Sequence, residues 1–116
     1  MADCLFCGIV SGDVPAEVVR TDERTVAFRD INPQAPIHVL VVPKRHIANA
    51  GEVTAEDADD VAALLVAAKA VADAEGVGGA DRGYRLVFNV GPDALNSVDH
   101  LHLHVLGGRA FEWPPG

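Results

Sequence analysis

The segment VDHLHLHVLGG, residues 98–108, places His100, His102 and His104 at every second position. Because successive side chains of a β-strand point to opposite faces, a strand here would gather the three imidazoles on one face, about 6–7 Å apart. The leucines and valine between them would form an apolar opposite face. Imidazole can attack a phosphorus or acyl centre and form a covalent intermediate, and it is also a common zinc ligand. The segment is therefore the first candidate for chemistry.

Three interpretations of these histidines stay open from the residues alone. At most two neighbouring imidazoles on a flat strand can reach one metal ion, because zinc–nitrogen bonds are only about 2.0–2.1 Å long. Nucleophilic chemistry on a phosphate requires groups that bind an anion. The preceding loop offers them as the amide of Asn89, the backbone at Gly91 and the hydroxyl of Ser97. The structural alternative is a half-exposed strand that carries histidine on its solvent side.

The only two cysteines, Cys4 and Cys7, form a C-x-x-C pair close to the N-terminus. Such a pair is typical of half a metal site or of a redox pair. The redox interpretation requires a preceding strand, and none is predicted there. A structural disulfide is not expected in a reducing cytosol.

The composition is that of one domain with an aliphatic core. The 116 residues are 49% apolar and only 5% aromatic, so valine, leucine, isoleucine and alanine must form most of the core. The net charge of -8 argues against nucleic acid or an anionic membrane as the main partner. No segment resembles a signal peptide or is long enough to span a bilayer, and we expect a cytoplasmic protein.

The elements that must position these residues follow from periodicity and turn signals. A short helix is expected over residues 3–11, with Asp3 as its cap. The long helix begins at Thr54, where Thr54 and Asp57 resemble a capping box, and it ends at Gly76. Strands are predicted over residues 17–20, 25–30, 37–43, 84–90 and roughly 98–106. This order predicts an α+β domain whose antiparallel sheet is covered by the long helix.

Three segments together resemble the histidine triad (HIT) family. HLHLHVLGG fits the family's pattern of alternating histidines and apolar residues, and DINPQAPIHVLVVPKRHI, residues 30–47, resembles its first half. GGRAFEWPPG, residues 107–116, resembles the C-terminus of the histidine triad nucleotide-binding (Hint) branch. The resemblance implies one HIT domain over residues 1–116, with a five-stranded antiparallel sheet, one long helix and one short helix. It also implies a two-fold homodimer with a continuous sheet.

The resemblance implies hydrolysis of purine nucleoside phosphoramidates or aminoacyl-adenylates to the nucleoside monophosphate. His102 would attack the α-phosphorus, water would hydrolyse the resulting nucleotidyl-histidine, and no cofactor would take part. The other implied residues are His100 and His38 beside the nucleophile; His104, Asn89 and Ser97 at the phosphate; Asp30 and Ile31 at the ribose; and Leu5, Phe6, Ile9 and Phe28 around the base. Without the resemblance, the apolar members are ordinary core residues and the polar members are turn and strand-end residues.

The resemblance also implies a structural zinc ion. Several bacterial members of the family bind zinc through two N-terminal cysteines, a histidine after a Pro-Lys pair and the first triad histidine. Cys4, Cys7, His46 and His100 fill these positions. A Cys2His2 set leaves no open coordination position, so the zinc would tie the N-terminal helix to the sheet rather than act in catalysis. The alternative is two buried thiols and a surface histidine.

The chain departs from the Hint pattern close to the predicted site. Ala94, Leu95 and Asn96 stand where two glycines and a glutamine are common, and Asp99 stands where an aromatic residue is frequent. These departures leave the leaving-group preference open. Three other functions fit parts of the sequence: a dinucleoside polyphosphate hydrolase, a nucleotide-binding regulatory dimer, and a structural zinc domain. The GGRxxxWPPG tail argues against the first. The intact triad argues against the second, which Leu95 and Asp99 keep open. The third leaves His102, His104 and His38 unexplained.

Overall fold

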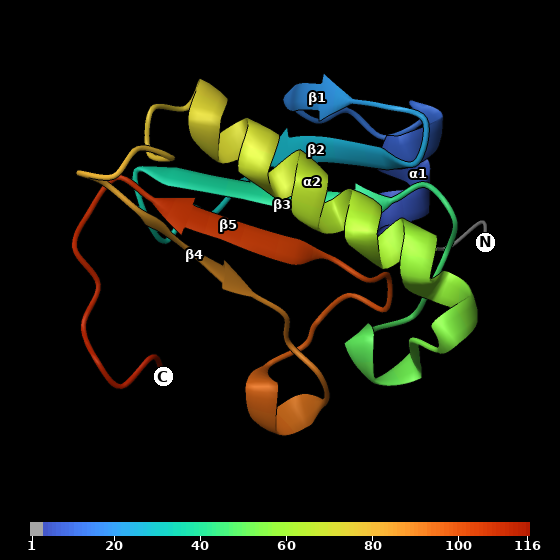
Figure 1. Cartoon of the computed structure of the whole chain (residues 1–116). Helices are drawn as coiled ribbons and strands as arrows, with labels where there is room; N and C mark the ends of the chain where they lie inside the picture. The colour runs from blue at the N-terminus through green and yellow to red at the C-terminus, as the bar shows by residue number, and fades with distance from the viewer. Residues whose placement is uncertain (1–3) are drawn as a thin grey trace.

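One five-stranded antiparallel sheet with a helix against each face forms the framework of the protein (Figure 1). The structure is a computed structural model, and it describes residues 4–116. In chain order the elements are α1 (Leu5–Ser11), β1 (Val18–Thr21), β2 (Thr25–Arg29), β3 (Ile37–Pro43), η1 (Ala50–Glu52), η2 (Ala55–Asp57), α2 (Ala58–Ala74), β4 (Tyr84–Val87), η3 (Pro92–Ala94) and β5 (Leu103–Gly107). The predicted α+β class is confirmed, with one long and one short helix.

The strands lie in the order β1-β2-β3-β5-β4, so the strand that carries the last triad histidine is next to the central strand. In the β3–β5 ladder Leu40 lies opposite His104, and His38 lies opposite Leu106. All neighbouring pairs are antiparallel. The pairing therefore brings two histidines that are 66 positions apart in the chain onto adjacent strands.

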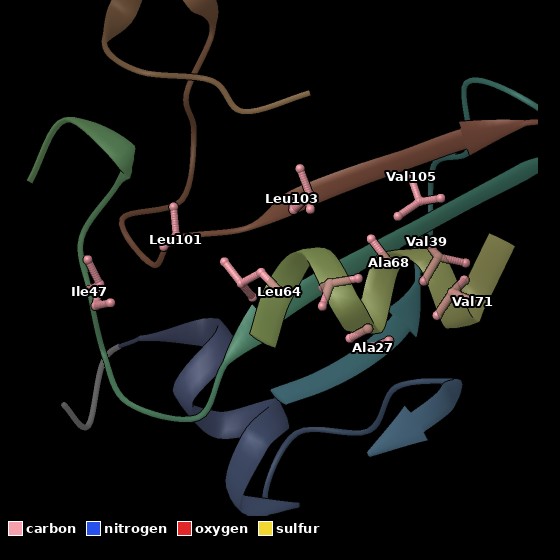
Figure 2. Packing of buried hydrophobic residues seen from close by; sticks show 11 residues of the cluster. Ala27, Val39, Ile47, Leu64, Ala68, Val71, Leu101, Leu103 and Val105 are labelled. Atoms are coloured by element: carbon pink, nitrogen blue, oxygen red, sulfur yellow. The ribbon is translucent and has the colours of Figure 1, made fainter. Parts of the chain in front are cut away.

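The alternation of side chains divides the buried residues into two layers. Leu64, Ala68 and Val71 of α2 pack on one face of the sheet with Leu103 and Val105, whose side chains are almost fully buried (Figure 2). A smaller cluster forms on the opposite face, where α1 lies. Its buried members are Phe6, Val26, Phe28, Leu40 and Val42. The α2 face is thus a closed core, whereas the α1 face has room for a site.

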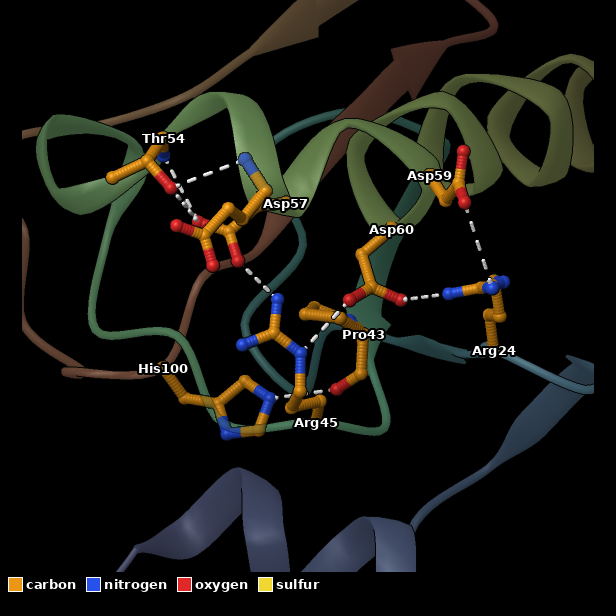
Figure 3. A network of polar contacts seen from close by, with 9 residues as sticks. Arg24, Pro43, Arg45, Thr54, Asp57, Asp59, Asp60 and His100 are labelled. Carbon is orange, nitrogen blue, oxygen red and sulfur yellow. Dashed lines mark hydrogen bonds and ion pairs between the residues drawn. The ribbon is translucent and has the colours of Figure 1, made fainter.

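The start of α2 is held to the segment that follows β3. The predicted capping box of Thr54 and Asp57 is present, although this first turn is the 3-10 helix η2 and the α-helix itself begins at Ala58. Arg45 pairs with Asp57 and also donates to Asp60 at 2.9 Å (Figure 3). These contacts hold the backbone of residues 44–46, which includes His46, in place.

Two predicted strand boundaries were wrong. The last strand was predicted over 98–106, but β5 begins at Leu103, so His100 and His102 precede it. The reason is that β3 ends at Pro43, which has no N–H for a ladder. The N–H of Leu101 donates to Ile47 instead, at 2.6 Å. The strand predicted over 84–90 likewise ends early, as β4, where its pairing with β5 stops.

Two further observations concern the helices. The predicted cap at Asp3 lies outside the described residues, and the structure places Cys4 at the N-cap of α1. Within residues 4–116, no helix has the length and apolar character needed to cross a bilayer.

Candidate functional site

The three triad histidines share the α1 face of the sheet, although only His104 belongs to a strand. The ring centroids of His102 and His104 are 5.1 Å apart. Phe6 of α1 meets the ring of His102 edge-on at 5.2 Å and that of His100 at 6.1 Å. Leu101, between the two, packs in the α2 cluster instead. The alternation therefore continues beyond the end of the hydrogen-bonded strand.

A backbone hydrogen bond determines which nitrogen of His102 carries the proton. Nδ1 of His102 lies 2.7 Å from the carbonyl oxygen of His100. A carbonyl only accepts hydrogen bonds, so Nδ1 is the donor and Nε2 of the neutral ring keeps its lone pair. His102 thus has an unprotonated nitrogen, which is what a nucleophile requires.

His104 is set in the opposite tautomer by a chain of hydrogen bonds. The backbone N–H of Gln34 donates to Nδ1 of His38 at 3.0 Å, so the proton of His38 lies on Nε2. This Nε2 is 2.8 Å from Nδ1 of His104 and 3.4 Å from a carboxylate oxygen of Asp30. His104 therefore accepts at Nδ1 and has its own N–H at Nε2.

Burial keeps both members of this chain uncharged near neutral pH. Desolvation, with smaller contributions from His102 and His38, lowers the pKa of His104 to about 4. Burial also lowers the pKa of His38, while the charge of Asp30 acts in the opposite direction. Neutral imidazoles at these positions can pass hydrogen bonds along without adding cations to the buried site.

A pocket of about 400 Å³ opens beside His102 and His104, between α1 and the sheet. Nine of the predicted site residues line it: Leu5, Phe6, Ile9, Phe28, Asp30, Ile31, Ser97, His102 and His104. Most of the lining is apolar, with a few polar groups among it, as is usual for a small-molecule site. Phe6 and Phe28 are also core residues, and they meet edge-on at 5.3 Å.

The pocket also includes residues that the sequence analysis did not select. These are Val14, Pro15, Ala16, Arg29, Leu40 and Val98. Leu40 could have been found, because it lies two residues from His38 and so on the same face of β3. The 14–16 segment has no comparable signal, since its position depends on the path of the turn after α1.

The structure does not bring Asn89 to the pocket lining. Its side-chain amide donates to the carbonyl oxygen of Ala94 at 2.9 Å, so it braces the loop that leads to Ser97. In this loop Leu95 has a φ of 59° and its side chain is 86% exposed. It is the one non-glycine residue with a positive φ among residues 4–116.

Cys4, Cys7, His46 and His100 converge at the first turn of α1, with ligand atoms all within 4.8 Å of one another. The sulfur of Cys7 is 3.3 Å from Nδ1 of His46, and both sulfurs are 3.4 Å from Nδ1 of His100. Zinc bonds of about 2.3 Å to sulfur and 2.0–2.1 Å to nitrogen imply tetrahedral S···N distances of about 3.6 Å. The cluster therefore matches a closed zinc site.

A hydrogen bond and a pKa shift also favour a cation in this cluster. Nε2 of His100 donates to the carbonyl oxygen of Pro43 at 2.8 Å, so the lone pair of Nδ1 faces the two sulfurs (Figure 3). Burial next to Cys4 raises the pKa of the Cys7 thiol, which means that two adjacent thiolates require a compensating positive charge. The four residues can hold a zinc ion.

Asp30, His38 and His104 also lie within 4.8 Å of one another at their ligand atoms. The 2.8 Å between the two imidazole nitrogens is shorter than the roughly 3.3 Å expected for two ligands of a tetrahedral zinc. It is the distance of a hydrogen bond. We therefore interpret this second cluster as a hydrogen-bonded chain rather than a metal site.

Comparison with known proteins gives consistent matches over nearly the whole chain. The HIT domain family model matches residues 11–111. A HIT-like protein of Synechococcus elongatus is 47% identical over 114 residues, covering 98% of this chain and 97% of the relative. A 14 kDa zinc-binding protein of Brassica juncea is 44% identical, covering 98% of this chain and the whole of the relative. The crystal structure of a HIT family hydrolase from Legionella pneumophila Philadelphia 1 has 51% identity and a TM-score of 0.93, covering 98% of this chain and 100% of that one.

We predict that the purified protein contains about one zinc ion per chain, because four ligands saturate one tetrahedral ion. Replacing both cysteines in C4A/C7A should abolish zinc binding and lower the melting temperature, since the metal links α1 to the sheet. Elemental analysis and thermal unfolding, with and without a chelator, check this. Wild-type protein without zinc after refolding with the metal would contradict it.

We predict that His104 makes stability fall as the pH drops from 6.5 toward about 4. The folded state holds His104 neutral while the unfolded chain takes up the proton, so the contribution is present above pH 6.5 and is lost on acidification. Denaturant unfolding of the wild type and of H104N as a function of pH measures the difference. Equal pH slopes for the two proteins would show that His104 titrates normally.

Proposed function

The chain belongs to the HIT domain family, and we propose that it is a nucleotide hydrolase in which His102 is the nucleophile. Its substrates are purine nucleoside phosphoramidates or aminoacyl-adenylates. The observation that carries the proposal is the position of His102, which lines the pocket with its Nδ1 bound to a carbonyl and its Nε2 unprotonated. The whole chain, residues 1–116, acts as one HIT domain.

In the proposed reaction Nε2 of His102 attacks the α-phosphorus of the bound nucleotide. A bond forms between phosphorus and Nε2, while the bond from phosphorus to the amine nitrogen, or to the carboxylate oxygen of the aminoacyl group, breaks. The carboxylate leaves with the bonding electrons, and the amine leaves with those electrons and a proton taken from solvent. Water then hydrolyses the nucleotidyl-histidine, which releases the monophosphate and restores the ring. The hydrogen bond from Nδ1 to the His100 carbonyl remains throughout, and it stabilises the positive charge that the ring gains on attack.

Neutral donors stabilise the phosphoryl oxygens in this proposal. His104 offers its Nε2–H, because its Nδ1 is occupied by the contact from His38. Ser97 lines the same pocket, and its hydroxyl is a second neutral donor. A chain with a net charge of -8 has little general attraction for an anionic substrate, so such local donors must hold the phosphate.

The apolar lining of the pocket suits a base, and the carboxylate of Asp30 suits a ribose. Phe6, Ile9 and Phe28 offer flat or aliphatic surface on which a purine can stack. Asp30 lines the pocket, with one carboxylate oxygen accepting from the N–H of Asn32 at 2.8 Å. Its remaining lone pairs can accept from ribose hydroxyls.

A structural zinc ion completes the proposed active form. Cys4, Cys7, His46 and His100 hold it, and when bound it supplies a cross-link between α1 and the sheet rather than a Lewis acid. The zinc ion would affect the pocket by fixing the positions of α1 and His100. α1 contributes Phe6 to the pocket, and His100 supplies the carbonyl that orients His102.

We also propose a homodimer that forms through the edge strand β4. The sheet has two edges, β1 and β4. β1 contains a register shift between Val18 and Arg20, and such bulges discourage pairing with another chain. β4 pairs with β5 without a shift and exposes Leu86 to 38%, so its free edge suits a second β4.

We predict that H102A hydrolyses an adenosine 5′-phosphoramidate with a fluorescent amine about 10³-fold more slowly than the wild type, or slower still. Each of the five histidines belongs to the zinc cluster, to the hydrogen-bonded chain or to the pocket lining, so the chain offers no histidine outside the site as a control. Zinc content and melting temperature of H102A control for folding instead. An inactive wild type that still binds nucleotide would favour the regulatory dimer, and turnover of a dinucleoside polyphosphate alone would favour that hydrolase.

We predict a mass in solution of twice the 12.2 kDa of one chain, measured by sedimentation. L86D should give monomers, because it places a carboxylate on the β4 edge. The matched control is V18D on the β1 edge, where Val18 is 48% exposed, and it should remain dimeric. Dissociation by V18D and not by L86D would assign the interface to the other edge.

A further inference from the structure

A second pocket lies at the far end of the sheet from the zinc cluster. Its volume is about 560 Å³, larger than that of the pocket beside His102. It is formed by residues 81–85, where β4 begins, and by residues 108–111, just after β5 ends. None of these residues lines the pocket beside His102. The second pocket is therefore separate from the proposed catalytic pocket, and it lies at the start of the strand through which we propose that the dimer forms.

Three of the nine cationic residues of an acidic chain gather in this pocket. They are Arg82, Arg85 and Arg109, and Asp81 is the one carboxylate that lines it. In the part of the chain that the structure describes, none of the three arginines forms an ion pair. By contrast, each of the other four arginines of the protein pairs with a carboxylate. The pocket thus concentrates positive charge that is not neutralised within this chain.

Two of these guanidinium groups are held in place by contacts that leave their positive charge uncompensated. The carbons of Arg85 and Arg109 at the centre of their guanidinium groups lie 4.9 and 4.3 Å from the centroid of the Phe111 ring. Arg85 donates to the carbonyl oxygen of Glu112, and Arg109 donates to that of Gln34 at 3.2 Å. Neutral carbonyls position the side chains but leave their charge uncompensated.

Such an arrangement has the chemistry of a phosphate-binding site. Guanidinium groups bind oxyanions through charge-assisted hydrogen bonds, and the planar fork of arginine matches phosphate geometry. Side chains that are already ordered lose less conformational entropy when the ligand binds. The volume is in the range of small-molecule sites, so there is room for more than a single anion.

We propose that Arg82, Arg85 and Arg109 form a binding site for a phosphoryl group, either free or carried by a nucleotide. The site is distinct from the pocket of His102 and does not depend on the proposed hydrolase activity. Phe111 and the flanking carbonyls orient the guanidinium groups, and Asp81 limits the excess of positive charge.

The test is a titration of the isotope-labelled protein with inorganic pyrophosphate, followed by NMR of the backbone amides and the arginine Nε–H groups. Saturable shifts are expected at residues 82–85 and 108–111, with weaker binding at higher salt. A parallel titration with adenosine monophosphate distinguishes a free from a nucleotide-borne phosphoryl group. R85Q/R109Q should weaken the affinity about tenfold or more, since two charge-assisted contacts are lost.

The matched control is K44Q, which removes the charge of an exposed lysine outside both pockets and should leave the affinity within about twofold. The melting temperature of R85Q/R109Q shows whether the variant folds, and R85K/R109K, which keeps the charge, should restore part of the binding. Shifts confined to residues 97–104 would overturn the proposal. A second result would also overturn it: the wild type does not respond to pyrophosphate, and R85Q/R109Q is monomeric. The arginines would then neutralise negative charge on a second copy of the chain.

Discussion

Two hydrogen bonds from imidazole rings to backbone carbonyls determine how the rest of the site is arranged. Nε2 of His100 donates to Pro43, and Nδ1 of His102 donates to the carbonyl of His100 itself. Each bond fixes one tautomer, so His100 offers Nδ1 to the two sulfurs while His102 offers Nε2 to the pocket. His100 therefore belongs to the cysteine–histidine cluster through its ring and to the pocket of His102 through its carbonyl group. Any movement of the metal ligand also moves the acceptor that orients the second histidine.

These bonds exist because the β-ladder stops where it does. The last pair of the β3–β5 ladder is Val41 with Leu103, and the carbonyl of Pro43 beyond it accepts from the His100 side chain. The N–H of Leu101 goes to Ile47, which keeps the segment extended and leaves its alternation intact. Leucines consequently point to α2 and histidines to α1. Helix α1 is only seven residues long, too short to be stable alone, so it depends on packing by Phe6 and on the cysteine cluster.

The parts of the fold that follow from periodicity could be predicted, and those that depend on distant partners could not. The five strands, the long helix and the capping box of Thr54 follow from local patterns, and the structure confirms them. The length of the last strand does not, because it depends on the proline in another strand. The family pattern selected nine of the residues that line the pocket beside His102, whereas the place of residues 14–16 depends on the path of the chain after α1. The role of Asn89 as a brace depends on its contact with Ala94, and sequence spacing does not show that contact.

The loop before Ser97 holds a residue with a Cβ in a backbone conformation that glycine adopts freely. Leu95 adopts the left-handed conformation that glycine adopts freely, at a cost of roughly 1–2 kcal/mol for a residue with a Cβ. Hydrogen bonds compensate for this cost: Leu95 donates to Pro92 at 3.0 Å, Asn96 donates to Gly91 at 3.2 Å, and Asn89 closes the loop on Ala94. The turn is thus imposed by its hydrogen bonds rather than by glycine freedom. The consequence is chemical as well as structural, because Ser97 lines the pocket and a large exposed apolar side chain, Leu95, stands two residues before it.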